Sequence, residues 1–125
     1  MNHDLTELLA TFAARDVRYL VVGGYAVTFH SKPRFTKDLD VWVDPTPANA
    51  VKVEQALAEF GAPLTAHGVT AKDFERPGVV YQMGLPPNRV DVLTAVDGLS
   101  FGPCWDRRVV SSLGNTPVAY LSKAD

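Results

Sequence analysis

The sequence is poor in the features that mark secreted and membrane proteins. It has a single cysteine, Cys104, so no internal disulfide bond can form. No stretch comes near the roughly 18 consecutive apolar residues of a membrane-spanning helix. The first residues, MNHDLTELLATF, do not follow the basic-then-apolar order of a secretion signal. We therefore expect a cytoplasmic protein without a membrane partner.

Net charge is also low. The 12 Lys and Arg residues nearly balance the 14 Asp and Glu residues, which leaves a formal charge of −2 at pH 7. Nucleic-acid-binding proteins usually carry a basic stripe or a strong excess of basic residues, so DNA is not expected as a partner. A local basic surface would be sufficient to bind tRNA, and that interaction stays open.

The composition is that of one packed domain. Of the 125 residues, 46% are hydrophobic and 21% are charged, which is near the average of soluble globular proteins. A chain of this length buries most of the surface that it exposes when unfolded. We therefore treat residues 1–125 as a single domain with one core.

Hydrophobic periodicity and turn residues divide the chain into helices and strands. The helix over 46–60 is the best marked, because Thr46 and Pro47 supply an N-cap and a first-turn proline and Gly61 supplies a stop. The full pattern predicts helices at 4–15, 24–31 and 46–60, helical turns at 70–74 and 101–107, and strands at 17–22, 38–43, 79–85, 89–94, 108–113 and 117–121.

Asp38, Asp40 and Asp91 are the candidate catalytic residues and metal ligands. In the segment DLDVWV, residues 38–43, the alternation with apolar residues predicts a strand that carries Asp38 and Asp40 on one face. Asp91 lies in RVDVL, another predicted strand, and joins the pair if the two strands are neighbours. Carboxylate oxygens suit a hard cation such as Mg²⁺. Three clustered carboxylates make sense mainly where a cation neutralises their repulsion.

A plainer interpretation of Asp38 and Asp40 is that they form the solvated face of an edge strand. The pair Gly23-Gly24 favours the functional interpretation, because it follows the predicted strand at 17–22. At a strand-to-helix turn, the missing side chains let backbone N–H groups approach phosphate oxygens.

Two arginines stand near these acids. Arg34 precedes Asp38 and is the candidate contact for a triphosphate, with an ordinary solvated loop as the alternative. Arg89 either steadies Asp91 or a phosphate, or is only a surface partner of a nearby acid.

The segment VVGGYAVTFHSKPRFTKDLDVWV resembles the signature of the DNA polymerase β-type nucleotidyltransferase superfamily. That signature has a Gly-Gly or Gly-Ser turn, an Asp-x-Asp strand and a third acid on a later strand. Here Gly23-Gly24, thirteen further residues, Asp38-Leu-Asp40 and then Asp91 occur in that order, and the resemblance spans residues 17–94. By GGYAV and RFTKDLD the chain is most similar to small bacterial nucleotidyltransferase-like proteins that include toxin components of abortive-infection systems.

The resemblance implies an α/β (α+β) fold, with a mixed β-sheet flanked by helices, and two magnesium ions. It also implies attack by a bound hydroxyl on the α-phosphate of a nucleoside triphosphate such as ATP, with release of pyrophosphate. Asp38 and Asp40 would bind metal and phosphates, and Asp91 would bind metal and position or deprotonate the acceptor hydroxyl. The nucleotide would be bound by Gly23, Gly24 and Arg34. The acceptor is an RNA end, a protein side chain or a small molecule, so tRNA and a partner protein both stay open.

Three functional hypotheses follow. The first is a nucleotidyltransferase, the second is a non-catalytic nucleotide- or protein-binding module of a toxin–antitoxin type system, and the third is a sensor that binds nucleotide without turnover. The end of the chain bears on the first, because Ser122 to Asp125 has the form of a capping box without its helix. Either the natural protein continues into further C-terminal helices that help to hold the base or acceptor, or these residues are a frayed polar tail.

Overall fold

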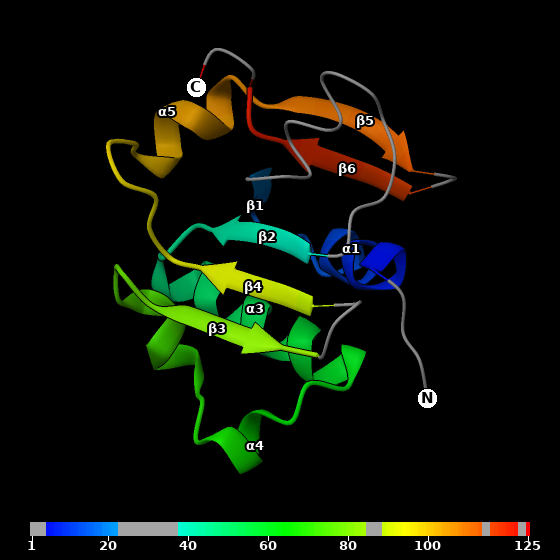
Figure 1. Cartoon of the computed structure of the whole chain (residues 1–125), viewed down its shortest axis with the longest axis vertical. Coiled ribbons are helices and arrows are strands. Elements are labelled where there is room, and N and C mark those ends of the chain that lie inside the picture. Colours follow the sequence, from blue (N-terminus) through cyan, green and yellow to red (C-terminus); the bar gives the residue numbers. More distant parts are fainter. Residues whose placement is uncertain (1–4, 23–37, 85–88, 114–115, 123–124) are drawn as a thin grey trace.

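The computed structural model describes residues 5–22, 38–84, 89–113, 116–122 and 125 (Figure 1). In chain order its elements are α1 (Leu5–Ala14), β1 (Tyr19–Val22), β2 (Asp38–Val43), α3 (Pro47–Phe60), α4 (Leu64–His67), the 3-10 helix η1 (Ala71–Glu75), β3 (Val80–Met83), β4 (Arg89–Leu93), α5 (Phe101–Asp106), β5 (Val109–Leu113) and β6 (Thr116–Tyr120).

The described strands form one mixed six-stranded sheet in the order β3-β4-β2-β1-β6-β5. The pairs β2·β4 and β1·β6 are parallel, whereas β1·β2, β3·β4 and β5·β6 are antiparallel. This arrangement confirms the expected mixed sheet with helices. It also places β2 and β1 in the centre of the sheet.

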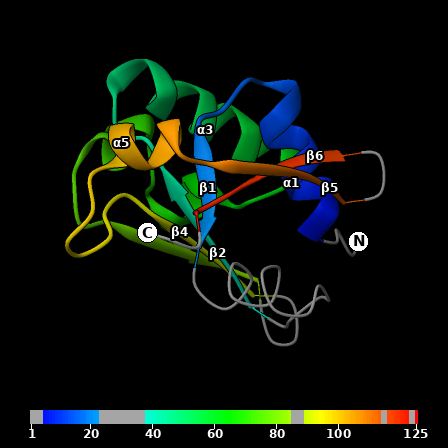
Figure 2. The same cartoon turned by 90° about the horizontal axis from the view of Figure 1, so that it is seen from above.

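Helices α1 and α3 cover one face of the sheet (Figure 2). Their inward side chains and every second residue of β2 are almost completely shielded from solvent, as the helical and strand periodicities require. These side chains are Leu8, Leu9 and Phe12 of α1, Val53, Ala56 and Leu57 of α3, and Leu39, Val41 and Val43 of β2.

The other face of β2 carries the residues that alternate with this core set. Trp42 is 2% exposed, and its ring makes an edge contact with Phe101 of α5 at 5.1 Å between ring centroids. Its indole Nε1 is buried without a hydrogen-bond partner among the described residues. Trp42 is therefore a packing residue.

Helix α3 begins and ends where the sequence predicts. The Thr46 side chain accepts a hydrogen bond from the backbone N–H of Asn49, and Pro47 occupies the first turn, where its missing N–H costs nothing. At the other end Gly61 adopts a left-handed conformation with φ of 110°, and its N–H bonds to carbonyls of the last turn.

Most of the other predicted elements are confirmed, with shorter bounds at several ends. The strand at 38–43 has the bounds predicted, and the hairpins at 79–94 and 108–121 form. The short helix α4 was not predicted, and the helix predicted at 24–31 lies outside the described residues. No helix in the described part of the chain is long and apolar enough to cross a membrane.

Candidate active site

Asp40 and Asp91 lie opposite one another on neighbouring parallel strands. The register of β2 against β4 pairs Asp38 with Arg89 and Asp40 with Asp91. Paired residues of adjacent strands point to the same face of a sheet, and the strands are about 4.8 Å apart. The sheet therefore brings together two of the three predicted acids, which are 51 positions apart in the sequence.

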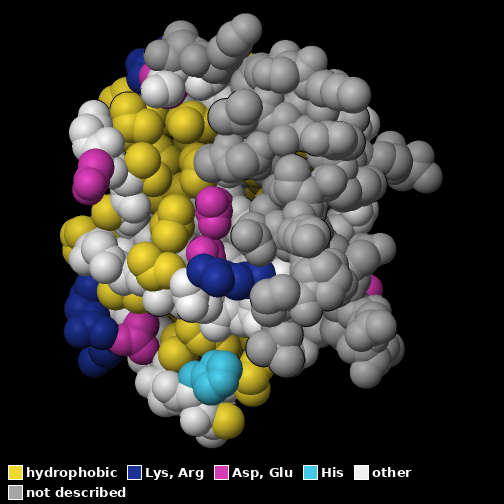
Figure 3. All heavy atoms as spheres, in the orientation of Figure 1, with side chains coloured by type: hydrophobic (Ala, Val, Ile, Leu, Met, Phe, Trp, Pro, Cys, Tyr) yellow, Lys and Arg dark blue, Asp and Glu magenta, His cyan; other side chains and the backbone are white. Residues whose placement is uncertain are grey.

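These acids belong to the face of the sheet that α1 and α3 leave uncovered. Leu39 and Val41 are buried in the helix-covered core, so the pleat directs Asp40 to the opposite face. Figure 3 shows acidic side chains on this face over the middle strands, next to basic ones. Asp40 and Asp91 are both half-buried. Two partly desolvated carboxylates of the same sign on one face need a compensating positive charge.

Arg89 supplies part of that compensation. Its guanidinium binds Asp91 through two bonds, Nε to Oδ1 at 3.2 Å and Nη2 to Oδ2 at 3.3 Å. The Asp91 side chain is 16% exposed and that of Arg89 is 39% exposed, so the pair is partly shielded from water. A bidentate contact with an arginine fixes the plane of the carboxylate as well as its position. Of the roles considered for Arg89, the structure thus shows the contact with Asp91.

The structure contradicts one part of the plainer interpretation of Asp38 and Asp40, namely that their strand is an edge strand. Strand β2 is paired on both sides, with β4 on one and β1 on the other. Asp40 is in register with Val22 of β1 and with Asp91 of β4, so it has a neighbouring residue on each side in the sheet.

The remaining predicted residues are placed only in part. Asp38 is the first residue of β2, but its side chain lies outside the described part of the structure. Gly23, Gly24 and Arg34 also lie outside the described residues. The last residue of β1, Val22, is in register with Asp40, so the glycine pair follows in the chain directly after the neighbour of an acid.

The donor set suits a hard cation. Carboxylate oxygens are the ligands that Mg²⁺ prefers, and Asp40 and Asp91 offer them from one face. Among the residues with described side chains, no group of three or more His, Cys, Asp or Glu is arranged to hold a metal, and Asp38 is not among those residues. The fit to magnesium therefore depends on two acids whose positions are shown, Asp40 and Asp91, and on Asp38, which lies on the same strand as Asp40.

Arg89 is the site residue for which the sequence pattern predicted no definite role. Its spacing from Asp91 contained the relevant signal. Residues i and i+2 of a strand point to the same face, so a strand over 89–93 places the side chains of Arg89 and Asp91 next to each other.

Neither a scan against models of known protein families nor a search of curated proteins finds a match for this chain. The motif and the geometry of the sheet are therefore the basis for inferring a function.

Proposed function

We propose that this protein is a magnesium-dependent nucleotidyltransferase of the cytoplasm, which moves a nucleoside monophosphate from a nucleoside triphosphate onto an acceptor hydroxyl. The observation that supports it most directly is the register of Asp40 with Asp91 on central parallel strands, with Asp38 two residues before Asp40. The acceptor hydroxyl belongs to an RNA end such as that of tRNA, to a protein side chain or to a small molecule.

Each acid has a role that its place in the sheet allows. Asp38 and Asp40 would hold magnesium against the phosphates, because alternate residues of a strand present their oxygens to the same side. Asp91 would complete the metal site and position the acceptor hydroxyl. Arg89 keeps the Asp91 carboxylate in one orientation through its two bonds. Gly23, Gly24 and Arg34 would bind the triphosphate.

The reaction is a displacement at phosphorus. The acceptor oxygen bonds to the α-phosphorus, the bond from that phosphorus to the oxygen bridging to the β-phosphate breaks, and pyrophosphate leaves with the electron pair. The hydroxyl proton passes to a carboxylate of the site or to solvent. Bound magnesium would supply stabilisation of the attacking and leaving oxygens. The protein contributes position and charge.

Thermal unfolding with each nucleoside triphosphate, with and without Mg²⁺, tests the binding part of the proposal. A ligand present at about 100 times its dissociation constant stabilises the native state by about 2.7 kcal/mol. We expect a magnesium-dependent rise in the unfolding temperature that is lost in Asp40→Asn and in Asp91→Asn. Asp106→Asn, which makes the same charge change at an exposed residue of α5, is the matched control and should keep the rise.

Pyrophosphate release separates the enzyme from the other two hypotheses. An enzyme releases pyrophosphate when a suitable acceptor is present and loses that activity in the Asp40 and Asp91 variants. A nucleotide sensor shows the thermal shift with no pyrophosphate for any acceptor class. A non-catalytic module that acts through its protein surface shows no magnesium-dependent shift with any triphosphate, and that result would contradict the proposal.

A further inference from the structure

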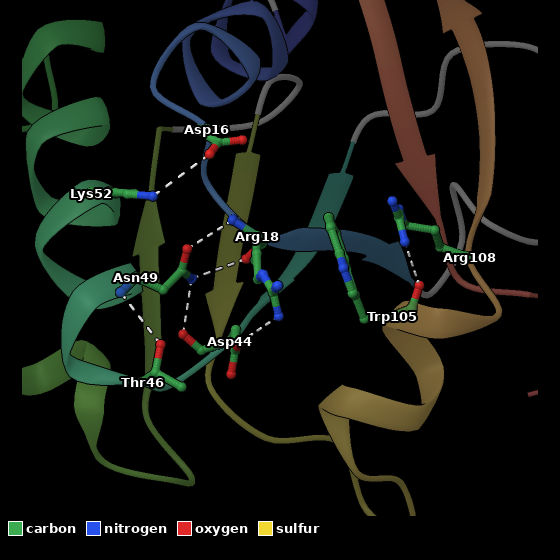
Figure 4. A network of polar contacts seen from close by, with 8 residues as sticks. All are labelled: Asp16, Arg18, Asp44, Thr46, Asn49, Lys52, Trp105 and Arg108. Atoms are coloured by element: carbon green, nitrogen blue, oxygen red, sulfur yellow. Dashed lines mark hydrogen bonds and ion pairs between the residues drawn. The ribbon is translucent and has the colours of Figure 1, made fainter.

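A cleft lies at the end of the sheet away from the start of β2. It has a volume of about 530 Å³, and its walls include Arg18, Asp44, Asn49, Lys52, Trp105 and Arg108 (Figure 4). Arg18 directly precedes β1 and Asp44 directly follows β2, and these strands are antiparallel, so both residues lie at the same sheet end. Asp44 is four residues beyond Asp40, which corresponds to about 13 Å along a strand. The cleft is thus separate from the candidate active site.

One buried side chain, that of Asn49, fixes the backbone segments that form this cleft. Asn49 is 4% exposed and makes three hydrogen bonds to backbone: its Oδ1 accepts from Arg18 N at 2.7 Å, and its Nδ2 donates to Arg18 O at 3.0 Å and to Asp44 O at 2.9 Å. These bonds join the start of β1, the end of β2 and the first turn of α3. The side chains of Arg18 and Asp44 therefore project from a fixed backbone.

Two guanidinium groups flank one indole ring. The Arg108 carbon Cζ lies 3.9 Å from the centre of the Trp105 ring, and that of Arg18 lies at 5.4 Å. Figure 4 shows Trp105 between the two arginines. An aromatic ring attracts a cation to its face, so Trp105 offsets part of the repulsion between the two neighbouring guanidinium groups.

Most of the hydrogen-bond donors of these arginines are not used within the described residues. The Arg18 guanidinium has an ion-pair contact with Asp44 at 3.9 Å and no shorter polar contact there. Arg108 donates one bond, from Nη1 to the Trp105 carbonyl at 2.9 Å. A guanidinium has five N–H donors, whose planar arrangement suits hydrogen bonds to a phosphate or a carboxylate. The geometry thus leaves several charge-assisted donors for a ligand.

Other features of the cleft add to its positive character. Lys52 is a further cation of the wall. Asp16 also lines the cleft and lies 3.7 Å from Lys52, but its side chain is 99% exposed, so this ion pair is weak and the three cations of the wall outnumber its two acids. Thr46 and Ala48 of the cleft wall belong to the N-terminus of the 14-residue helix α3, where the helix dipole favours an anion.

We propose that this cleft binds a phosphate group carried by a molecule of nucleotide size, with Arg18, Arg108 and Lys52 as the phosphate contacts. A volume of about 530 Å³ is within the usual range of small-molecule sites and is too large for inorganic phosphate alone. The group belongs either to a free mononucleotide or to the 5′ end of a short RNA strand. Its recognition chemistry is the same in both cases.

The negative charge of Asp44 repels a phosphate, so a variant without that charge should bind the ligand more tightly, whereas the arginine variants should bind it less tightly. Its carboxyl is half-buried beside Arg18, and burial raises its pKa against the lowering effect of Arg18. A phosphate entering the cleft meets the negative charge of Asp44. Asp44→Asn removes that charge and leaves the backbone carbonyl that bonds Asn49 in place.

The test is an NMR titration of the whole chain in EDTA, so that magnesium-dependent binding at the carboxylates does not contribute. The ligands are adenosine 5′-monophosphate, adenosine, and a short RNA with and without a 5′-phosphate. We expect the monophosphate to shift the amide signals of Arg18, Ala48 and Asn49 and the indole signal of Trp105. A monophosphate that binds better than the RNA indicates the small-molecule source, and a phosphorylated RNA that binds better indicates the strand end.

Variants then assign the contacts. Arg18→Gln and Arg108→Gln should each weaken the affinity about tenfold, the equivalent of about 1.4 kcal/mol, and Asp44→Asn should strengthen it. Arg76→Gln, at an exposed arginine outside the cleft wall, is the matched control and should have no effect. The proposal is overturned if adenosine binds as well as its monophosphate, if no signal of the cleft moves, or if Arg18→Gln and Arg76→Gln bind alike. Because Asp44→Asn is expected to gain affinity, a loss of folding in an arginine variant cannot imitate the full pattern.

Discussion

Replacing Asn49 by alanine should lower the free energy of unfolding by more than the loss of a single surface contact would. The substitution removes three hydrogen bonds to Arg18 and Asp44 backbone atoms in a place where the side chain is 4% exposed. A typical hydrogen bond contributes about 1 kcal/mol, and a buried group left without a partner costs about 1 to 3 kcal/mol. We therefore expect a loss of about 3 kcal/mol in the free energy of unfolding.

Urea unfolding at 25 °C measures this loss. With a denaturant slope of about 1 to 3 kcal/mol per molar, the midpoint should fall by about 1 to 3 M. Val51→Ala is the control in the same helix, because Val51 is 45% exposed and should change stability by less than about 0.5 kcal/mol.

Asn49→Asp refines the result. It keeps the acceptor for the Arg18 N–H but replaces the donor to two carbonyls by an oxygen that repels them. Its negative charge in the first turn of α3 recovers only about 0.3 to 1 kcal/mol, so we expect a loss of about 2 kcal/mol or more. A loss below about 1 kcal/mol for Asn49→Ala would refute the view that this side chain joins the two strands to the helix.

Three further outcomes follow from the contacts. Gly61→Ala should cost about 1 to 2 kcal/mol in urea unfolding, since Gly61 has φ of 110° and a side chain is strained there. Burial raises the pKa of the Asp44 carboxyl in the folded state above its value in the unfolded state. The free energy of unfolding therefore falls as the pH rises from the unfolded-state pKa through the folded-state pKa. Asp44→Asn should therefore stabilise the protein at neutral pH and not at a pH below about 3.9; an equal gain at both values would exclude this cause. Arg89→Gln should change stability by less than about 1 kcal/mol and still reduce pyrophosphate release, because it frees the Asp91 carboxylate to rotate; unchanged release would show that orientation by Arg89 is not needed.

Local sequence signals were sufficient for the elements that carry the acids. The alternation in DLDVWV fixed both the bounds of β2 and the face on which Asp40 lies, because a strand has a period of two. Thr46, Pro47 and Gly61 fixed the ends of α3 through capping, which needs only neighbouring residues. A pattern confined to one segment could be predicted for this reason.

Strand neighbours could not be derived in the same way. From the sequence, Asp91 was expected to lie near Asp40 only if their two strands are neighbours. The parallel pairing of β2 with β4 depends on the packing of the whole sheet. The cleft beside Arg18 and Trp105 could not be predicted for the same reason. Arg18, Asn49 and Trp105 come from three separate segments, and none of them stands in a motif.

Strand β2 connects the two candidate sites, because it contains Asp40 and ends directly before Asp44 of the cleft. This raises the question of whether a ligand in one site affects the other. Asp40 and Asp44 are about 13 Å apart along the strand, which is beyond the screening length of about 8 Å at physiological salt. Substitutions further apart than about 7 to 10 Å, with no common partner, usually have additive effects. We therefore expect Arg18→Gln to leave the magnesium-dependent affinity for nucleoside triphosphate unchanged within about twofold. A larger change would mean that β2 or the sheet around it has two arrangements that each ligand favours differently, since coupling between separate sites requires such a difference.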